Sequence, residues 1–271
     1  MTTFQKVVKY LAIAFAAFLT VSIIGGLLSA IGLFGGFIFR DTATGDMEAY
    51  TVSSEIRNID IDISAADLCI EEGDKFYVES NLKRLKVEEK SGRLTIKETN
   101  KQFSKYYGAM LTIYVPADTV FDRAILNTGA GRLTIDSLSA DVLRFELGAG
   151  EVSIDSLTAS KTADIDGGAG RITISDGSLN DLNLNVGVGQ LNLTSELTGN
   201  CDMELGVGES NINIIGNKED YRLVVEKGIG NVTVDGNEVS DYQSGGNGSN
   251  SIKIDGGVGT INVRFEESDT K

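Results

Sequence analysis

Two patterns of apolar and polar residues divide the chain. From Tyr10 to Phe39 the residues are uncharged and mostly apolar, whereas beyond residue 50 apolar residues alternate with polar ones over short stretches. A helix needs about 20 apolar residues to cross a bilayer, so the first pattern predicts a transmembrane anchor within residues 1–40. Alternation with a period of two is typical of strands with one buried face, so the second pattern predicts an all-β domain.

The anchor is expected to remain uncleaved. Its apolar run exceeds the ~7–15 residues of a signal-peptide core, and no convincing cleavage site follows it. A cleaved secretory signal peptide is the alternative. Lys6 and Lys9 precede the run and acidic residues follow Arg40, which by the positive-inside tendency predicts a cytoplasmic N-terminus and an extracytoplasmic β domain. The expected location is therefore the cell membrane, crossed once.

A repeat of 19 or 20 residues dominates the rest of the chain. A Gly-x-Gly motif occurs seven times, and the first five copies start 19, 20, 19 and 19 residues apart. Alternating apolar residues precede and follow the motifs, as in Leu143–Leu147 and Val152–Ile154. The pattern predicts two short strands per repeat, joined by a bend where glycine permits close backbone approach. The glycines of these structural turns are Gly129, Gly131, Gly148, Gly150, Gly168, Gly170, Gly187, Gly189, Gly206, Gly208, Gly228, Gly230, Gly257 and Gly259.

Repeats this short bury their apolar faces only by stacking on one another. The predicted fold is therefore a parallel β-solenoid, or β-helix, that covers residues 126–265 and is followed by a polar tail at 266–271. Residues 41–125 are expected to form an irregular β cap with degenerate first repeats, in which Ser64-Ala65-Ala66 stands at a bend position.

The cap segment contains two further elements. Val87–Ile96 predicts a hairpin that turns at Ser91-Gly92, and Met110–Val115 predicts a strand that ends at Pro116. The alternation in the degenerate repeat places Cys69 outward, whereas Cys201 falls on an inward position. We therefore expect no disulfide between these two cysteines.

Several of these segments carry a family resemblance. Ile59–Ile63, Leu111–Pro116 and the repeats of the type Asn127–Gly131 resemble the bacterial "putative adhesin" family, whose members are β-strand-repeat domains of unknown function. The resemblance covers roughly residues 50–265 and implies a β-solenoid at the cell surface. It supplies no catalytic or ligand-binding residues.

Composition narrows the range of functions. The chain has no His, no Trp and only 2 Cys, which excludes Ser-His-Asp triads, imidazole zinc sites and a disulfide framework. Its net charge of −15 argues against a nucleic-acid partner. The segment 167–170 resembles a calcium-binding roll, but Ile172 stands where that roll needs Asp. No cofactor and no enzymatic activity are therefore expected.

An acidic column is expected on one outward face. The positions two residues before the bends are mostly acidic, and like charges on adjacent rungs repel unless a cation lies between them. A solvated face that keeps the protein soluble is the favoured interpretation, because no carboxylates are spaced to enclose an ion. The candidate residues of a cation stripe are Glu146, Asp164, Asp166, Asp202 and Glu204.

Two other surfaces are candidates for binding. Residues 75–105 carry nine basic residues against four Glu, which suits anionic lipid headgroups or a wall polymer, although a solvated hairpin edge is the simpler interpretation. The segment 236–250 is rich in Gly, Ser and Asn and contains a possible binding loop, Asp241, Tyr242 and Gln243. A flexible excursion without a ligand is the alternative.

These observations predict a membrane-anchored, non-enzymatic, extracytoplasmic module that acts as an adhesin or as an envelope binding or scaffold module. Its expected partner, besides the membrane, is a wall glycan or a surface protein. A membrane-linked scaffold that assembles end to end is an alternative, although the polar residues after Phe265 would discourage such stacking. A carbohydrate-active β-helix enzyme ranks last, because nothing marks a cleft with a carboxylate pair.

Overall fold

The computed structural model describes residues 43–52, 55–99, 106–243 and 248–267. All of them belong to one compact unit, which comprises Ala43–Lys101 and Tyr106–Lys271. Among these residues, no helix combines the length and the apolar character that a membrane crossing requires. The anchor predicted within residues 1–40 lies outside the described residues.

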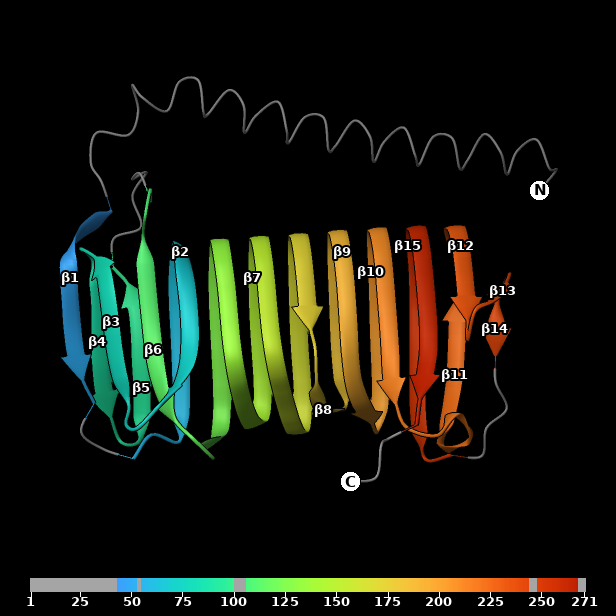
Figure 1. The fold of residues 1–271 in the computed structure, drawn as a ribbon, viewed down its shortest axis with the longest axis horizontal. Coiled ribbons are helices and arrows are strands. Elements are labelled where there is room, and N and C mark those ends of the chain that lie inside the picture. Colours follow the sequence, from blue (N-terminus) through green and yellow to red (C-terminus); the bar gives the residue numbers. More distant parts are fainter. Residues whose placement is uncertain (1–42, 53–54, 100–105, 244–247, 268–271) are drawn as a thin grey trace, which may run out of the picture. The chain divides into compact units, whose positions relative to one another are not determined.

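The described unit is all-β, and its strands join into a single sheet that winds into stacked coils (Figure 1). A 3-10 turn at Lys218–Asp220 is the only helical element of the described part. In chain order the strands are β1 (Thr44–Thr51), β2 (Asn58–Gly73), β3 (Tyr77–Leu82), β4 (Leu85–Lys90), β5 (Arg93–Glu98), β6 (Met110–Pro116), β7 (Val120–Ile174), β8 (Gly177–Asn180), β9 (Leu182–Thr198), β10 (Asn200–Ile215), β11 (Tyr221–Glu226), β12 (Ile229–Val234), β13 (Asn237–Val239), β14 (Tyr242–Gln243) and β15 (Asn250–Glu266).

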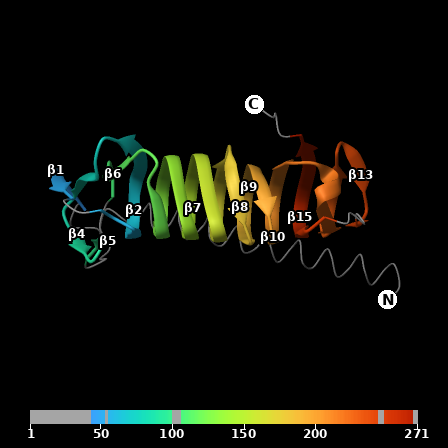
Figure 2. The same cartoon turned by 90° about the horizontal axis from the view of Figure 1, so that it is seen from below.

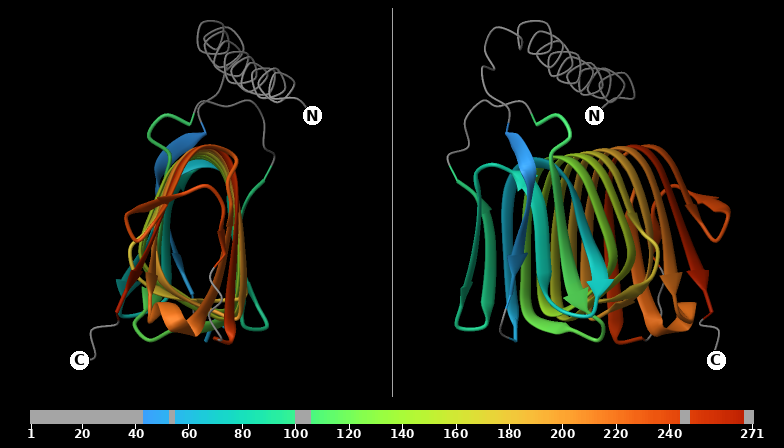
Figure 3. Two further views of the ribbon diagram at one scale, coloured as in Figure 1. Left: turned by 90° about the vertical axis from the view of Figure 1, so that its right-hand side faces the viewer. Right: turned by 60° about the vertical axis from the view of Figure 1, so that its left-hand side comes forward.

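The coils stack in parallel and in register, which confirms the predicted solenoid. Leu184 of β9, for example, lies between Ile165 of β7 and Met203 of β10. All three side chains are buried, because alternate positions along each strand point into the coil. Successive coils follow nearly the same closed path when seen along the stack (Figure 3). Each fully buried aliphatic side chain contributes roughly 1.5–3 kcal/mol, so a column of such rungs supports itself.

Each coil also has a third, short face that the apolar pattern did not reveal. Leu157 and Ala159 are buried there and pair in parallel with Gly177 and Leu179 of β8. Leu197 of β9 continues the same face. The prediction of two strands per repeat was wrong in this respect, because a face with one or two apolar residues is too short to show a period of its own.

The N-terminal end of the stack contains the predicted degenerate coil. Ala65 of β2 pairs with Ala130 of β7, as the alignment of Ser64-Ala65-Ala66 with a bend requires. The hairpin and the strand expected in the cap are β4–β5 and β6. Strands β5 and β6 pair in parallel with β2, whereas β4 and β3 pair with them in antiparallel fashion, and β1 is antiparallel to β3. The parallel stack therefore ends in antiparallel strands.

The C-terminal end departs from the expected order. Strand β15 lies between β10 on one side and β11 and β12 on the other, so the last strand in sequence is not the last rung (Figure 1). The polar residues after Phe265, expected to discourage end-to-end stacking, therefore follow an inner rung rather than the outermost one. The outer rung is closed instead by β13 and β14, which pair in antiparallel fashion with β12 and β11. Every repeat has a similar inward pattern, so periodicity alone does not specify their order.

Carboxylates complete both ends at the bend. Glu98 of β5 is buried and accepts a hydrogen bond from the backbone N–H of Ser64, at 3.0 Å, as well as one from the hydroxyl of Tyr106. At the opposite end, Asp241 accepts a hydrogen bond of 3.0 Å from the backbone N–H of Lys227. Each carboxylate takes the place of the carbonyl that a further rung would supply. Figure 2 shows the two ends, with β1, β4 and β5 at one and β13 at the other.

The two cysteines and Ser210 have defined places in the coil. Cys69 is half-buried on the outer face, Cys201 is buried, and both thiols are free, as predicted. Ser210, which interrupts the apolar alternation after Gly208, keeps the register and occupies the inward slot between Leu191 and Ile261. No bulge is therefore needed to absorb the extra polar residue.

Candidate functional site

The Gly-x-Gly bends form one continuous edge of the stack. Gly189 pairs with Gly170 on one side and Gly208 on the other. A Cβ atom on Gly170 would lie 1.8 Å from the carbonyl oxygen of Gly150 on the adjacent rung. That contact is impossible for any side chain, and a φ of +141° at Gly170 disfavours one independently. The glycine positions of this edge therefore carry no side chain, whereas the residue between the two glycines is Ala, Val or Ile and is exposed at Ala149, Ala169 and Val188.

An open groove of about 1440 Å³ runs beside these bends. One wall is the glycine edge, and the other is the outward column two residues before the bends. The groove extends from β2 through the coils of β7, β9 and β10 to β15. Its polar lining residues are Asp62, Ser64, Asn127, Thr128, Glu146, Asp166, Asn183, Asn185, Glu204 and Asp255.

The groove gathers part of the predicted acidic column. Glu146, Asp166 and Glu204 line it, whereas Asp164 and Asp202 do not. Asp62 and Asn183 also line it and were not anticipated. The sequence could have predicted Asp62 as part of the column, because it stands two residues before Ser64, the first residue of the degenerate bend.

Neighbouring polar groups satisfy several of these carboxylates. The amide of Asn185 donates a hydrogen bond of 2.8 Å to Asp166 Oδ1. Lys253 Nζ lies 2.7 Å from Asp255 Oδ2, and Arg144 Nε lies 3.5 Å from Glu146 Oε1. Glu204, Asp255 and Glu226 nevertheless follow one another on adjacent rungs, so amides and nearby cations offset the repulsion in only part of the column.

Part of the candidate cation stripe is interrupted by an amide. Asp164 and Asp202 are not adjacent, because both pair with Asn183, which lies between them. Within the described part of the chain, no group of three or more His, Cys, Asp or Glu side chains is placed to hold a metal ion. A hard cation such as Ca²⁺ takes six to eight oxygen ligands, which single carboxylates on a flat column do not supply.

The groove suits hydrogen-bonded recognition of an extended molecule. Asn127 Oδ1 and Asp255 Oδ1 are shielded from solvent and accept no hydrogen bond from any described residue. Carboxylate and amide oxygens accept hydrogen bonds from hydroxyl and ammonium groups, while the glycine wall lets a ligand approach the backbone closely. All the lining carboxylates come from one wall, so no two of them face each other across the groove.

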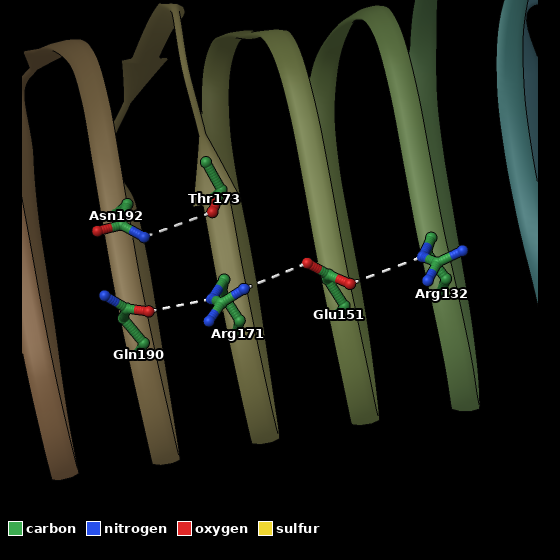
Figure 4. A network of polar contacts seen from close by, with 6 residues as sticks. All are labelled: Arg132, Glu151, Arg171, Thr173, Gln190 and Asn192. Atoms are coloured by element: carbon green, nitrogen blue, oxygen red, sulfur yellow. Dashed lines mark hydrogen bonds and ion pairs between the residues drawn. The ribbon is translucent and has the colours of Figure 1, made fainter.

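The opposite flank of the bend edge carries a polar ladder (Figure 4). Glu151 lies between two arginines, 3.6 Å from Arg132 Nε and 3.4 Å from Arg171 Nη1. Arg171 Nε also donates a hydrogen bond of 3.0 Å to Gln190. Such exposed pairs contribute about 0–1 kcal/mol each, so this flank is a surface of stability and solubility.

The residues of the possible binding loop lie in the C-terminal cap. Asp241 accepts the Lys227 N–H described above, and Tyr242 and Gln243 form β14. The ring of Tyr242 packs against the core, with Lys218 Nζ 5.5 Å from its centroid. These contacts give the three residues a structural role, and a ligand for them remains a prediction.

Comparison with known proteins identifies one family. The Toastrack DUF4097 family model matches residues 56–264. Among curated proteins, none matches this chain.

Solved structures of three bacterial proteins are similar to the chain. One is titled a putative cell adhesion protein from Clostridium sporogenes, with 16% identity, a TM-score of 0.36, and coverage of 82% of this chain and 99% of that one. A putative adhesin from Bacteroides fragilis has 12% identity, a TM-score of 0.45, and coverage of 82% and 96%. A putative adhesin from Parabacteroides distasonis has 15% identity, a TM-score of 0.44, and coverage of 83% and 99%.

Proposed function

This chain belongs to the Toastrack DUF4097 family, whose members are domains of unknown function, and on that premise we propose that it is a non-enzymatic binding module of the cell envelope. In this proposal residues 1–40 anchor it in the cell membrane and the coiled stack lies outside the cytoplasm. Its groove binds a linear envelope polymer, of which a wall glycan is the favoured kind.

The groove beside the glycine bends is the observation that carries the proposal. It follows seven consecutive rungs, from β2 to β15, and adjacent strands lie ~4.8 Å apart, so it is roughly 29 Å long. That length suits an extended chain more than a small molecule. Its oxygen-rich wall complements hydroxyl and ammonium groups, which glycans containing amino sugars present at regular intervals.

The placement of the carboxylates supports binding without catalysis. A glycosidase needs two carboxyl groups on opposite sides of the scissile bond, roughly 5–9.5 Å apart. Here Glu146, Asp166 and Glu204 all belong to one column, and the groove beside them is lined by the first glycine of each bend, which carries no acid or base. End-to-end assembly has less support than binding along the groove, because antiparallel strands close both ends of the stack.

Topology is the first test of the proposal. Ser137 is exposed, so a Ser137→Cys variant with Cys69→Ser and Cys201→Ala carries one accessible thiol. We expect a membrane-impermeant maleimide to label this thiol in intact cells. Labelling that occurs only after lysis would place the stack in the cytoplasm and overturn the envelope location.

Ligand binding is the second test. Soluble wall-glycan fragments should bind the purified protein, and the triple variant Glu146→Gln, Asp166→Asn and Glu204→Gln should lose at least ten-fold in affinity. The matched control removes three exposed carboxylates outside the groove, in Asp136→Asn, Asp155→Asn and Glu266→Gln. Equal losses in both variants would mean a general charge effect, and no binding to the unaltered protein would contradict the glycan as ligand.

A further inference from the structure

We propose that the outer face of the β4–β5 hairpin docks on anionic lipid headgroups beside the anchor. This inference rests on the proposed function, because it needs the membrane span predicted within residues 1–40. It adds a second contact between the protein and the bilayer, made by the cap rather than by the apolar segment. The contact would hold one defined end of the stack against the membrane.

The hairpin carries like charges in directly opposed positions. In the antiparallel pairing of β4 with β5, Lys86 faces Lys97 and Lys90 faces Arg93. Like charges directly opposite each other on one sheet face are destabilising. The fold does not require this arrangement, since these side chains lie on the face away from the core, into which Leu94 and Ile96 point. Four cations on one small face therefore point to an anionic partner.

Neighbouring carboxylates neutralise half of this face. Lys86 Nζ lies 2.7 Å from Glu88, and Lys97 Nζ lies 3.0 Å from Asp60 of β2. Lys90 and Arg93 are exposed on either side of the hairpin turn and form no ion pair with any described residue. These two residues at the tip are the ones available to an external anion.

The path of the chain brings the hairpin close to the bilayer. The carbonyl of Ala43 accepts a hydrogen bond of 2.9 Å from the backbone N–H of Lys83, two residues before β4 begins. Only four residue steps separate Ala43 from Phe39, where the predicted span ends. An extended chain covers at most ~3.6 Å per residue, so Ala43 lies within about 14 Å of the predicted span's end, and β4 runs from beside it to the hairpin tip.

The hairpin is basic whereas the rest of the stack is acidic, so an anionic membrane surface would attract only the hairpin end. Residues 75–98 hold seven basic side chains against four carboxylates, whereas residues 126–266 hold 9 against 21. An anionic surface therefore attracts the hairpin and repels the coils. Lipid headgroups fit better than a wall polymer, because the short connection keeps the cap near the membrane, where the hairpin reaches the surface by lying along it.

Full-length protein in nanodiscs tests the contact. A fluorophore is attached to Cys in a Ser91→Cys variant, at the hairpin turn, or in a Glu238→Cys variant, on β13 at the far end; both carry Cys69→Ser and Cys201→Ala. Quenching by nitroxide-labelled headgroups then reports proximity to lipid. We expect strong quenching at position 91 in discs that contain phosphatidylglycerol, weak quenching there in pure phosphatidylcholine, and little at position 238 in either.

The charge variants identify the cause. Lys90→Gln with Arg93→Gln should abolish the extra quenching in anionic discs and leave the unfolding midpoint equal or higher, because a repulsive pair is removed. Arg222→Gln with Arg264→Gln removes two exposed arginines near the other end and should change neither measurement.

Three outcomes would overturn the inference. Equal quenching at position 91 in neutral and anionic discs would mean that the tether alone holds the hairpin there. Equal losses in the two pairs of charge variants would mean that only net charge matters. A full-length chain that does not insert into discs would contradict the anchor itself, and that result is distinguishable because no labelled protein then elutes with the lipid.

Discussion

At the scale of single residues, the bends depend on the absence of side chains. Gly150 has a φ of +147°, and a Cβ built on it would lie 1.8 Å from the carbonyl oxygen of Gly131. Gly236, in the C-terminal cap, also has a positive φ, of +78°, but nothing lies within 4 Å of its Cβ position. The two positions therefore separate the effect of backbone strain from that of crowding between rungs.

We predict that Gly150→Ala lowers the free energy of unfolding by about 3 kcal/mol or more, because the rungs must move apart. Gly236→Ala should lower it by only about 1–2 kcal/mol, the ordinary penalty of a left-handed conformation. Urea unfolding followed by circular dichroism compares the two variants. Similar losses would show that φ alone decides and that contact between the rungs is unimportant.

Cys201 provides a prediction about pH. Burial raises the pKa of its thiol from 9.0 to about 11. Between these values the unfolded chain loses the proton while the folded protein retains it, so this group's stabilisation is complete below pH 9 and is lost as the pH rises towards 11. The loss should be about 2–3 kcal/mol, the linkage value of a pKa difference of that size.

Cys201→Ala should remove this part of the alkaline dependence. The measurement is the urea midpoint at pH 8 and at pH 10.5 for both proteins. Tyrosines that titrate in this range are common to the two and cancel in the difference. Parallel pH dependences would mean that the thiol ionises no more readily in the unfolded chain than in the folded protein.

At the scale of elements, the caps decide where the stack stops. Glu98 supplies an acceptor to the Ser64 N–H that no further rung satisfies. Glu98→Gln should lower the free energy of unfolding by about 2 kcal/mol, since Glu98 accepts hydrogen bonds at both carboxylate oxygens and Gln offers only one acceptor oxygen. Glu88→Gln, an exposed carboxylate on the same hairpin, should change it by less than about 1 kcal/mol. Thermal unfolding of the two variants checks this difference, and equal effects would contradict a capping role.

The sequence predicted the repeating elements well because, in each one, the alternation of apolar and polar residues shows which side chains are buried. The alternation around Gly148, the hairpin turn at Ser91-Gly92 and the strand before Pro116 all correspond to observed strands. The short face at Leu157 and Ala159 was missed, since three residues do not establish a period. The groove itself was not predicted: the acidic positions followed from the repeat, but the continuity of the groove from Asp62 to Asp255 depends on the order of the coils.

At the scale of the whole molecule, the order of the coils differs from the order of the sequence. The inward residues of β15, such as Ile252 and Ile254, match those of its neighbours on both sides. Hydrophobic matching therefore does not distinguish one stacking order from another. The long interval before the last bend is where the chain builds β13 and β14 before it returns to insert β15.

Truncation tests this arrangement. In a solenoid stacked in sequence order, removal of the last rung leaves the other rungs intact. Here removal of residues 244–271 eliminates β15 from between β10 and β11, so we predict loss of cooperative unfolding and aggregation of the product. Removal of residues 267–271 should have no measurable effect. A shortened chain that remained soluble and unfolded cooperatively would contradict the observed order.

The inserted position of β15 also has a consequence for biosynthesis. Strands β11 and β12 leave the ribosome before β15, yet the place beside β10 belongs to β15. Chains grow at ~5–20 residues per second, so the edge of β10 waits about 3–10 s for its partner. During that interval the nascent chain has an open edge, and a translation stop between residues 216 and 250 makes that edge permanent. An unfinished copy therefore differs from a finished one by the strand edge of β10 that β15 would cover.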